Sequence, residues 1–303
     1  MSTLLAAPPK ILRRDPILGN IIEHAQLRPY ITLARMQLKT PGLQEWTGPP
    51  GLGKSIAAQQ LALECNQEAD ANLPGAFRAV YFATAGDADH ETTRGMKRGV
   101  YTVFQGVLEE SLSAGEYKHM TENELAEMVV EHCRLMNIQL IVVDEAGTKT
   151  EAEMRGMAHI TNLALEEHWR LSILLVGMDD LANKMDEQKS LSSRTRRVLV
   201  FQHWSTEDFQ TFLETRDGII GEIFAKPTKD TRRVIEILHG ACRGEPRELD
   251  TLVCEVEIRI KNGASLRHAV ETAIAFRATQ VAASVAFARE YQTRKRNRRR
   301  RTS

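Results

Sequence analysis

Short hydrophobic runs alternate with amphipathic stretches along the chain from about residue 42 onwards. Five of these runs are aliphatic and bounded by polar or turn-forming residues, which is typical of buried strands. They cover residues 43–47, 79–83, 140–144, 172–176 and 198–201. Strands that alternate with helices favour a parallel sheet with helices packed on it. The pattern therefore predicts an α/β fold.

The stretches between the strands carry helix signals. Residues 54–64 follow directly from a glycine-rich loop, and residues 151–168 have apolar positions near helical spacing. Thr121 and Glu124 have the spacing of a capping box, which predicts a helix that runs to about Met136.

After Phe201 the strand pattern stops. Ser205 and Asp208 indicate another helix start, and the later apolar positions recur at helical spacing. Helices are expected over residues 231–243, 247–261 and 265–291. We expect four parts, namely an N-terminal arm (1–30), an α/β core (31–203), a helical domain (204–291) and a disordered basic tail (292–303).

Composition excludes several classes of protein. The 303 residues are 42% hydrophobic and 26% charged, which is typical of a globular chain and not of a disordered or collagen-like one. Cys65, Cys133, Cys242 and Cys254 have neither C-x-x-C nor zinc spacing, so we expect reduced, mostly buried thiols. No run approaches the ~20 apolar residues of a membrane span, and no signal peptide is recognisable. A cytoplasmic location without membrane partners is expected.

The formal net charge of zero hides an uneven distribution. Of 40 Lys+Arg and 40 Asp+Glu residues, seven basic residues and no acidic one fall within residues 294–303. The remaining 33 basic and 40 acidic residues give residues 1–293 a charge of −7. A run of like charges repels itself, which predicts disorder, and such tails commonly neutralise the phosphates of nucleic acids. The alternative is a merely solvated end.

The segment 48–55 fits the pattern G-x-x-x-x-G-K-[ST], between a predicted strand and a predicted helix. In this pattern the backbone N–H groups and the helix N-terminus surround phosphate oxygens. We expect Lys54 to reach the β- and γ-phosphates of ATP and Ser55 to ligate Mg²⁺. The alternative is a chance glycine-rich turn. The residues expected to bind the nucleotide are Gly48, Pro49, Pro50, Gly51, Leu52, Gly53, Lys54, Ser55 and Ile56.

Two adjacent carboxylates end the apolar run that begins at Gln139. Ligands of open α/β sheets bind at the carboxyl ends of the strands, which is where Asp144 and Glu145 are predicted to lie. We expect Asp144 to hold the Mg²⁺ shell. Glu145 is expected to orient and deprotonate the water that attacks the γ-phosphate.

The next predicted strand ends at a position where NTPases of this layout carry a polar residue that senses the γ-phosphate. This chain has Met178 there, and Asp179 is the nearest polar substitute. Asp179 is equally explained as a helix N-cap.

Two arginine positions are candidates for stabilising the transferring phosphoryl group. Arg194 begins a basic cluster before the last strand and is suited to reach a neighbouring subunit's nucleotide as an arginine finger. Arg247, at the start of a helix of the second domain, is suited to contact the nucleotide of its own subunit. The alternatives are a solvated basic turn and an ordinary helix-start arginine.

In this order the motifs resemble those of an AAA+ ATPase over about residues 30–280, which implies a P-loop NTPase core with a parallel sheet and a small C-terminal helical lid domain. Residues 175–181, 185–188 and 193–194 resemble the strings V-G-T-x-x-L, D-E-Q and [ES]-R-F of transposition ATPases of the TnsC, TniB and MuB type. Met178 replaces the Thr and Thr195 replaces the Phe. The second departure leaves Arg196 or Arg197 as alternative fingers.

The resemblance implies ATP-dependent oligomerisation on duplex DNA as a ring or filament, recruitment of a DDE transposase, a target-selector protein as a further partner, and disassembly on hydrolysis. In such filaments the helix after the second strand faces DNA, which implies contacts by Arg94, Lys97 and Arg98. The alternative for these three is a solvated basic face. Other interpretations of the whole chain are a helicase loader, and a signalling or secretion NTPase that does not act on DNA.

Overall fold

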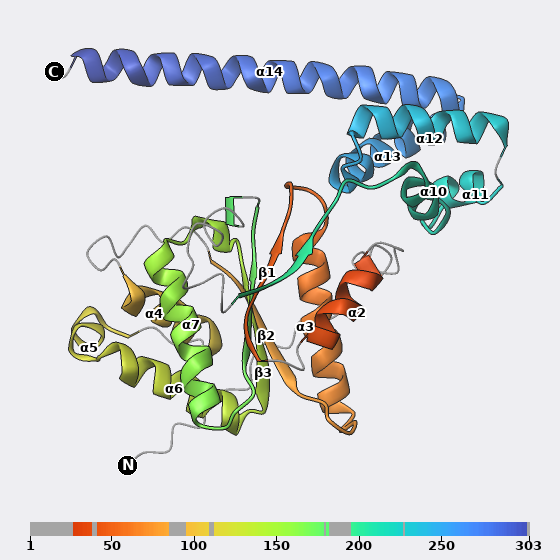
Figure 1. Cartoon of the computed structure of the whole chain (residues 1–303). Coiled ribbons are helices and arrows are strands. Elements are labelled where there is room, and N and C mark those ends of the chain that lie inside the picture. The colour runs from red at the N-terminus through yellow and green to blue at the C-terminus, as the bar shows by residue number, and fades with distance from the viewer. Residues whose placement is uncertain are drawn as a thin grey trace. The chain divides into compact units, whose positions relative to one another are not determined.

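The computed structural model describes most of the chain, and it divides into two compact units, residues 1–202 and 203–303 (Figure 1). The described residues are 27–37, 41–84, 95–108, 112–178, 180–181, 195–226 and 228–301.

Five parallel strands of the first unit form one sheet in the order β2-β3-β4-β1-β5. The strands are β1 (Gly42–Thr47), β2 (Arg78–Ala83), β3 (Ile138–Asp144), β4 (Ser172–Val176) and β5 (Thr195–Val200). The α/β fold and its five strands are thus confirmed, although β5 begins three residues earlier than predicted. Because the strands are parallel, the loops that follow β1, β3 and β4 leave from one edge of the sheet, with β4 between the other two.

Helices cover both faces of the sheet (Figure 1). One face carries α2 (Leu27–Gln37) and α3 (Lys54–Asp70), and the other carries α4 (Met96–Leu108), α6 (Glu122–Leu135) and α7 (Glu151–Glu166). Successive residues of a strand point to opposite faces. In β3, Leu140 and Val142 pack with α2 and α3, whereas Ile141 and Val143 pack with the other layer. This double burial is why β3 is apolar at nearly every position.

The predicted helix starts at Thr121 and Ser205 are confirmed as capping boxes. The Thr121 side chain accepts from the backbone N–H of Glu124, whose carboxylate accepts from the N–H of Thr121. Ser205 and Asp208 form the same reciprocal pair at the start of α10 (Thr206–Glu214). The short elements α5 (Ala114–His119) and η1 (Ala146–Thr148) complete the first unit.

Helices α4 and α7 cross so closely that two glycines are required. A Cβ atom on Gly99 would lie 1.8 Å from the carbonyl oxygen of Glu153, and one on Gly156 would lie 2.0 Å from that of Met96. Backbone atoms cannot move aside as a flexible side chain can. We expect Gly99→Ala to lower the free energy of unfolding by about 3 kcal/mol, the upper part of the range for overpacked cores.

The matched control for this prediction is Gly240→Ala. Gly240 also lies within a helix, but apart from the neighbouring backbone of that helix no atom lies within 4 Å of the position of its missing Cβ. Alanine there should be neutral or stabilise by up to about 1 kcal/mol through lower entropy of the unfolded chain. Thermal and urea unfolding measure both variants, and equal stability of the two would contradict the prediction.

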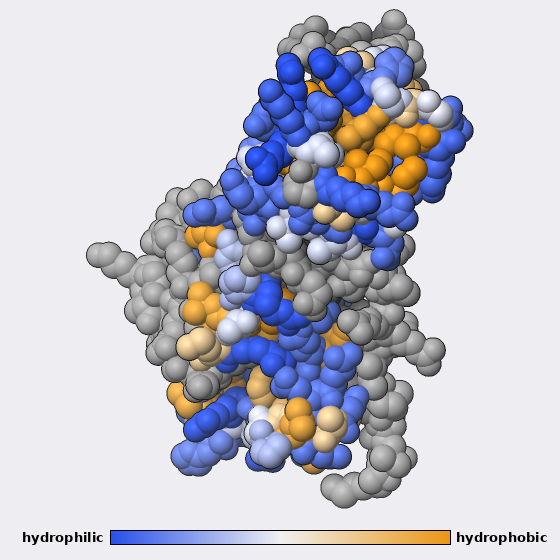
Figure 2. Space-filling view, turned by 90° about the vertical axis from the view of Figure 1, so that its right-hand side faces the viewer, coloured by the Kyte–Doolittle hydropathy of each residue, from blue (hydrophilic) through white to orange (hydrophobic). Residues whose placement is uncertain are grey.

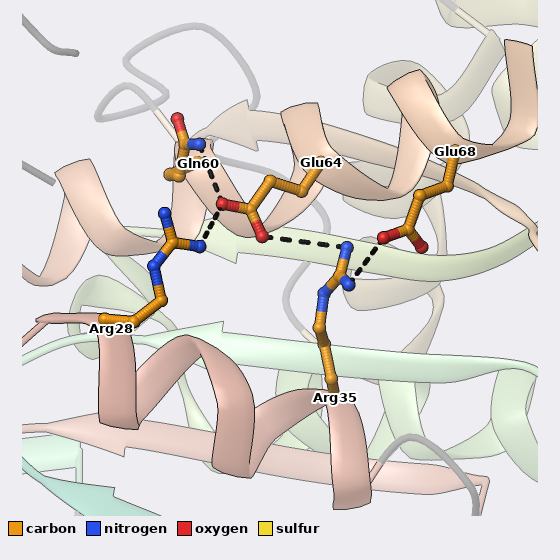
Figure 3. A network of polar contacts seen from close by, with 5 residues as sticks. All are labelled: Arg28, Arg35, Gln60, Glu64 and Glu68. Carbon is orange, nitrogen blue, oxygen red and sulfur yellow. Dashed lines mark hydrogen bonds and ion pairs between the residues drawn. The ribbon is translucent and has the colours of Figure 1, made fainter. Parts of the chain in front are cut away.

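A network of polar contacts braces α2 against α3 (Figure 3). Arg28 Nη1 lies 2.5 Å from Glu64 Oε1, which also accepts from Gln60 Nε2 at 2.8 Å. Arg35 reaches Glu68 at 2.7 Å and Glu64 at 3.7 Å. The Glu64 side chain is only 16% exposed, so these contacts are less screened by water than surface ion pairs are. The network fixes α2 along the helix that follows the phosphate loop.

Helix α2 crosses the boundary predicted between the arm and the core. Leu27 is fully buried, and its side chain lies 3.4 Å from the position that a Cβ on Gly53 would take. The residues predicted as the end of an arm therefore belong to the core. Leu27 packs against the glycine-rich loop at Gly53.

The second unit is helical. Its elements are α10, α11 (Ile219–Phe224), α12 (Lys229–Cys242), α13 (Pro246–Lys261) and α14 (Leu266–Arg301). In the core of this unit, Trp204 packs edge-on against Phe209 and Phe212. Apolar side chains also gather on the surface of this unit, seen at the top of Figure 2. Its exposed large hydrophobic residues include Ile258, Phe276, Val281 and Phe287.

The basic end of the chain differs from the prediction of disorder. The backbone of α14 is helical through Arg301. Arginine and lysine are good helix formers, and extending an existing helix costs far less than starting one. Helical propensity therefore outweighs the repulsion between like charges that suggested a disordered tail from residue 292.

Three of the four cysteines are buried, as predicted, and Cys254 is exposed. Burial raises the pKa of Cys65, Cys133 and Cys242 to about 12, so these thiols stay protonated and unreactive. Across the described ranges, every helix is too short or too polar to span a bilayer.

Candidate active site

The loop after β1 has the backbone conformation that its glycines make possible. Gly48, Gly51 and Gly53 have φ values of 141°, 81° and 89°, where residues with a Cβ are disfavoured. A Cβ on Gly48 would also lie 2.7 Å from the carbonyl oxygen of Phe201. The loop is therefore tightly curved and packed against the end of β5.

This curvature leaves a series of donors without acceptors. Within the described residues, the amides of Gly51, Leu52 and Gly53 donate no hydrogen bond. The amides of Ser55 and Ile56 lie in the first turn of α3, where a helix has no acceptor of its own for them. Such an arc of N–H groups at a helix N-terminus is suited to phosphate.

Lys54 lies over this loop. Its side chain is buried, and its Nζ donates to the carbonyl oxygens of Gly48 at 2.8 Å and Pro49 at 2.6 Å. The ammonium group is thereby held beside the free amides. The arrangement adds a full positive charge to the donors that suit phosphate.

Asp144 is buried at the carboxyl end of β3, and both of its oxygens accept hydrogen bonds. The N–H of Glu145 donates to Oδ1 at 2.8 Å, and the hydroxyl of Tyr81 donates to Oδ2 at 2.6 Å. Gln59 Nε2 in turn donates to the Tyr81 oxygen at 3.1 Å. Burial and the bond to Asp144 raise the pKa of Tyr81 above its usual range, so the phenol keeps its proton.

Glu145 stands where the chain turns out of the sheet. Its φ of 58° is a left-handed conformation that is uncommon for a residue with a side chain and often occurs at functional sites. Its carbonyl oxygen accepts from Thr148 Oγ1 at 3.0 Å and Thr84 Oγ1 at 3.3 Å. The backbone is thus held while the carboxylate is exposed and free to meet a water molecule.

The donors available suit Mg²⁺ in the presence of a nucleotide. Magnesium prefers oxygen ligands, usually one or two protein groups together with phosphates and water. The Asp144 carboxylate and the Ser55 hydroxyl are such groups. No cluster of three or more His, Cys, Asp or Glu side chains suited to a metal occurs in the part of the chain described. The residues therefore fit a metal held jointly with phosphate.

Arg94, Asp179 and Arg194, which the sequence suggested as functional, are outside the described residues. Arg196 and Arg197 lie in β5, in register with Gln44 and Glu45 of β1. They are therefore in the half of β5 that is farther from the phosphate loop.

Arg247 is exposed in the first turn of α13. The turn before it is held by Trp204, whose N–H donates to the carbonyl oxygen of Gly244 at 2.9 Å. Gly244 has a φ of 76°, and a Cβ there would lie 2.9 Å from the Trp204 carbonyl oxygen. The start of α13, and with it Arg247, is thus fixed within the helical unit.

Lys97 and Arg98, predicted to bind DNA, have partners within the protein. Lys97 Nζ donates to the carbonyl oxygen of Tyr117 and lies 4.4 Å from the centre of its ring. Arg98 Nε lies 3.1 Å from the buried Glu153 carboxylate. A phosphate contact through either side chain would have to replace these interactions.

Sequence reasoning did not single out Gln59, Tyr81 or Thr84. For Tyr81 and Thr84 the available signal was that polar residues near the end of β2 lie beside the end of β3 if the two strands are neighbours. Gln59 lies in α3, and no local signal marked it. Asp180 was also passed over in favour of Asp179. Its carboxylate lies beside Gly147, 2.9 Å from the position of a Cβ there, in the turn that follows Glu145.

Residues 38–185 match a family described as AAA domain, and this range includes the phosphate loop, Asp144 and Glu145. This range is an AAA domain, as found in AAA+ ATPases. AAA+ ATPases bind nucleotide, usually with Mg²⁺. No curated protein matches the chain.

Solved structures of AAA+ proteins are similar in fold. ORC2 of Aeropyrum pernix, in ADPNP–ADP complexes, is 15% identical with a TM-score of 0.54, over 90% of this chain and 70% of that one. A Walker-type ATPase of Pyrococcus abyssi is 15% identical with a TM-score of 0.55, over 88% and 76%. ORC1 of Aeropyrum pernix in complex with DNA is 19% identical with a TM-score of 0.52, over 83% and 64%. Identities this low show the fold alone.

Proposed function

We propose that this AAA+ ATPase is a regulator of transposition that assembles with ATP on duplex DNA as a ring or filament, marks the target, and recruits a DDE transposase. Hydrolysis of ATP disassembles it. The ATP-dependent part is supported by the topology, because Lys54 follows β1 and Asp144 ends β3 at the same edge of the sheet, with β4 between the two strands. The transposition part is supported by the resemblance of residues 175–181, 185–188 and 193–194 to transposition ATPases.

In this proposal the free amides of the loop and Lys54 bind the phosphates. Ser55 and Asp144 hold Mg²⁺, which when bound neutralises charge on the phosphate oxygens. The Glu145 carboxylate accepts a proton from the attacking water. Arg194 of a neighbouring subunit and Arg247 stabilise the charge that develops on the transferring group.

The proposed DNA contacts combine two kinds of basic residue. Residues 294–301 include seven basic residues, whereas residues 1–293 carry a net charge of −7. This segment is therefore the strongest electrostatic attraction for DNA that the sequence offers. Arg94, Lys97 and Arg98 are proposed as contacts inside the assembly. Because Lys97 and Arg98 have protein partners, they are expected to contribute less than the basic end. The likeness to ORC1 solved with DNA supports a DNA-related role.

The test is ATP-dependent binding of the purified chain to duplex DNA, measured at several salt concentrations and followed by capture of partners. Binding that needs ATP and weakens with salt, with capture of a transposase and not of a replicative helicase, is the expected result. Capture of a hexameric helicase would favour a loader. ATPase activity that ignores DNA, with no salt-sensitive binding, would favour an NTPase that acts elsewhere.

Removal of residues 294–303 is expected to weaken DNA binding and to flatten its salt dependence while leaving ATP affinity unchanged. Each phosphate no longer neutralised reduces the slope of log affinity against log salt by about 0.9. The control replaces Arg267, an exposed residue paired with Glu271 near the start of the same helix, by alanine. A truncated protein with an unchanged slope would exclude this segment from DNA binding.

A further inference from the structure

The Tyr81 hydroxyl links the helix of the phosphate loop to the carboxylate proposed to hold Mg²⁺. Tyr81 lies in β2, beside β3 in the sheet. Its oxygen donates to Asp144 Oδ2 at 2.6 Å and accepts from Gln59 Nε2 of α3 at 3.1 Å. Gln59 is four residues after Ser55, on the same side of α3. A continuous chain of hydrogen bonds therefore runs from this face of α3 to Asp144.

The direction of each bond follows from the protonation states. An ionised carboxylate only accepts, so Tyr81 must donate to Asp144. A tyrosine phenol ordinarily carries its proton at neutral pH, so it is able to donate. A neutral phenol is a poor competitor for Mg²⁺. Tyr81 therefore acts on the carboxylate and does not replace it as a ligand.

The Asp144 carboxylate is oriented from both sides. Oδ2 accepts from Tyr81 and Oδ1 from the backbone N–H of Glu145. Each carboxylate oxygen has about two lone-pair directions, so each keeps one for the metal or its water. Without the Tyr81 bond, only the bond from Glu145 would still orient the group. Rotation of the Asp144 carboxylate away from the metal would then cost less free energy.

We infer that Tyr81 is a positioning residue that sets the affinity of the site for Mg²⁺ by holding the Asp144 carboxylate in a fixed orientation relative to α3. This inference rests on the proposed role of Asp144 in the ATPase. Hydrogen bonds to the ligands of a metal typically change its affinity by 10- to 100-fold. The size of the effect is therefore measurable apart from catalysis.

The experiment measures the affinity for a fluorescent ATP analogue without metal and across a Mg²⁺ titration, on the full chain. Tyr81→Phe is expected to leave the metal-free affinity within about twofold and to raise the Mg²⁺ concentration at the midpoint about 10- to 100-fold. Tyr101→Phe is the matched control, because the Tyr101 hydroxyl accepts from the backbone N–H of Leu112 in the core and does not contact Asp144. It should leave the midpoint unchanged.

Asp144→Asn separates this inference from the proposed function. If it leaves the Mg²⁺ midpoint unchanged, the proposed metal site is wrong and the inference fails with it. If it shifts the midpoint while Tyr81→Phe behaves like Tyr101→Phe, only the inference is overturned. In the Asp144→Asn background, Tyr81→Phe should cause no further shift, and an additive shift would contradict action through Asp144.

A second variant keeps the test decisive if Tyr81→Phe folds poorly in thermal unfolding. Gln59→Leu removes the amide that positions the Tyr81 oxygen and leaves the phenol in place. It should raise the Mg²⁺ midpoint in the same direction by a smaller factor. An unchanged Mg²⁺ midpoint in folded Gln59→Leu would then overturn the inference.

Discussion

Replacement of Glu145 by glutamine is expected to slow ATP hydrolysis by about 100- to 10,000-fold and to leave ATP affinity within about threefold. Glutamine matches the size of glutamate but cannot accept a proton from water. The backbone N–H that Glu145 donates to Asp144 is preserved, so the orientation of Asp144 should not change. Phosphate release and equilibrium binding of ATP measure the two effects separately.

The control for this variant is Glu151→Gln. Glu151 is an exposed carboxylate at the start of α7, paired with Arg155 four residues later. Its replacement should alter neither rate nor affinity. Hydrolysis at the normal rate in Glu145→Gln would mean that another residue is the general base.

Glu145→Gln should also accumulate on duplex DNA with ATP as rings or filaments in electron micrographs. Their absence would contradict disassembly by hydrolysis.

Lys54→Ala is expected to lower ATP affinity by at least about 100-fold. Hydrogen bonds from a charged group contribute about 1.5–3 kcal/mol each, and Lys54 is proposed to donate to two phosphates. Its ammonium group lies 2.8 Å and 2.6 Å from two carbonyl oxygens of the loop, so it is already held beside the amides before any nucleotide arrives. Loss of this charge should therefore act on binding itself. Isothermal titration with ATP and Mg²⁺ measures it.

Two further variants make the Lys54 result specific. Lys54→Arg keeps the charge and should retain more affinity than Lys54→Ala, although a planar guanidinium fits the curved loop less well. Lys261→Ala removes an exposed lysine of the helical unit, paired with Glu257, and should have no effect. ATP affinity in Lys54→Ala equal to that of the unchanged protein would refute the assignment of the phosphate loop.

The local parts of the site could be predicted because their signals lie within a few residues. The run 48–55 contains the glycines that permit its turn and the lysine that binds phosphate. The strand ending at Asp144 is recognisable because burial on both faces makes residues 140–143 consecutively apolar. The capping box at Thr121 is likewise contained in four residues.

Other parts could not be predicted from local patterns. The first residues of β5 are Thr195, Arg196 and Arg197, which are polar, so only their pairing with β1 marks them as strand. In the sequence, residues 27–30 resemble the end of a mixed, proline-containing arm. Only the structure shows that Leu27 packs against Gly53 in the core. The helical end of α14 depends on extension of a helix that begins at Leu266.

The sequence by itself determined the α/β fold, the phosphate loop and the paired carboxylates, because each depends on short-range periodicity or on residue types at fixed spacing. Only the tertiary structure decided what surrounds those carboxylates. Gln59, Tyr81 and Asp144 are far apart in the chain and come together because β2 and β3 pair while α3 packs on the sheet. The tertiary structure likewise pairs Arg98 with the buried carboxylate of Glu153. Contacts of this kind depend on which elements become neighbours, and no local pattern of residues encodes that.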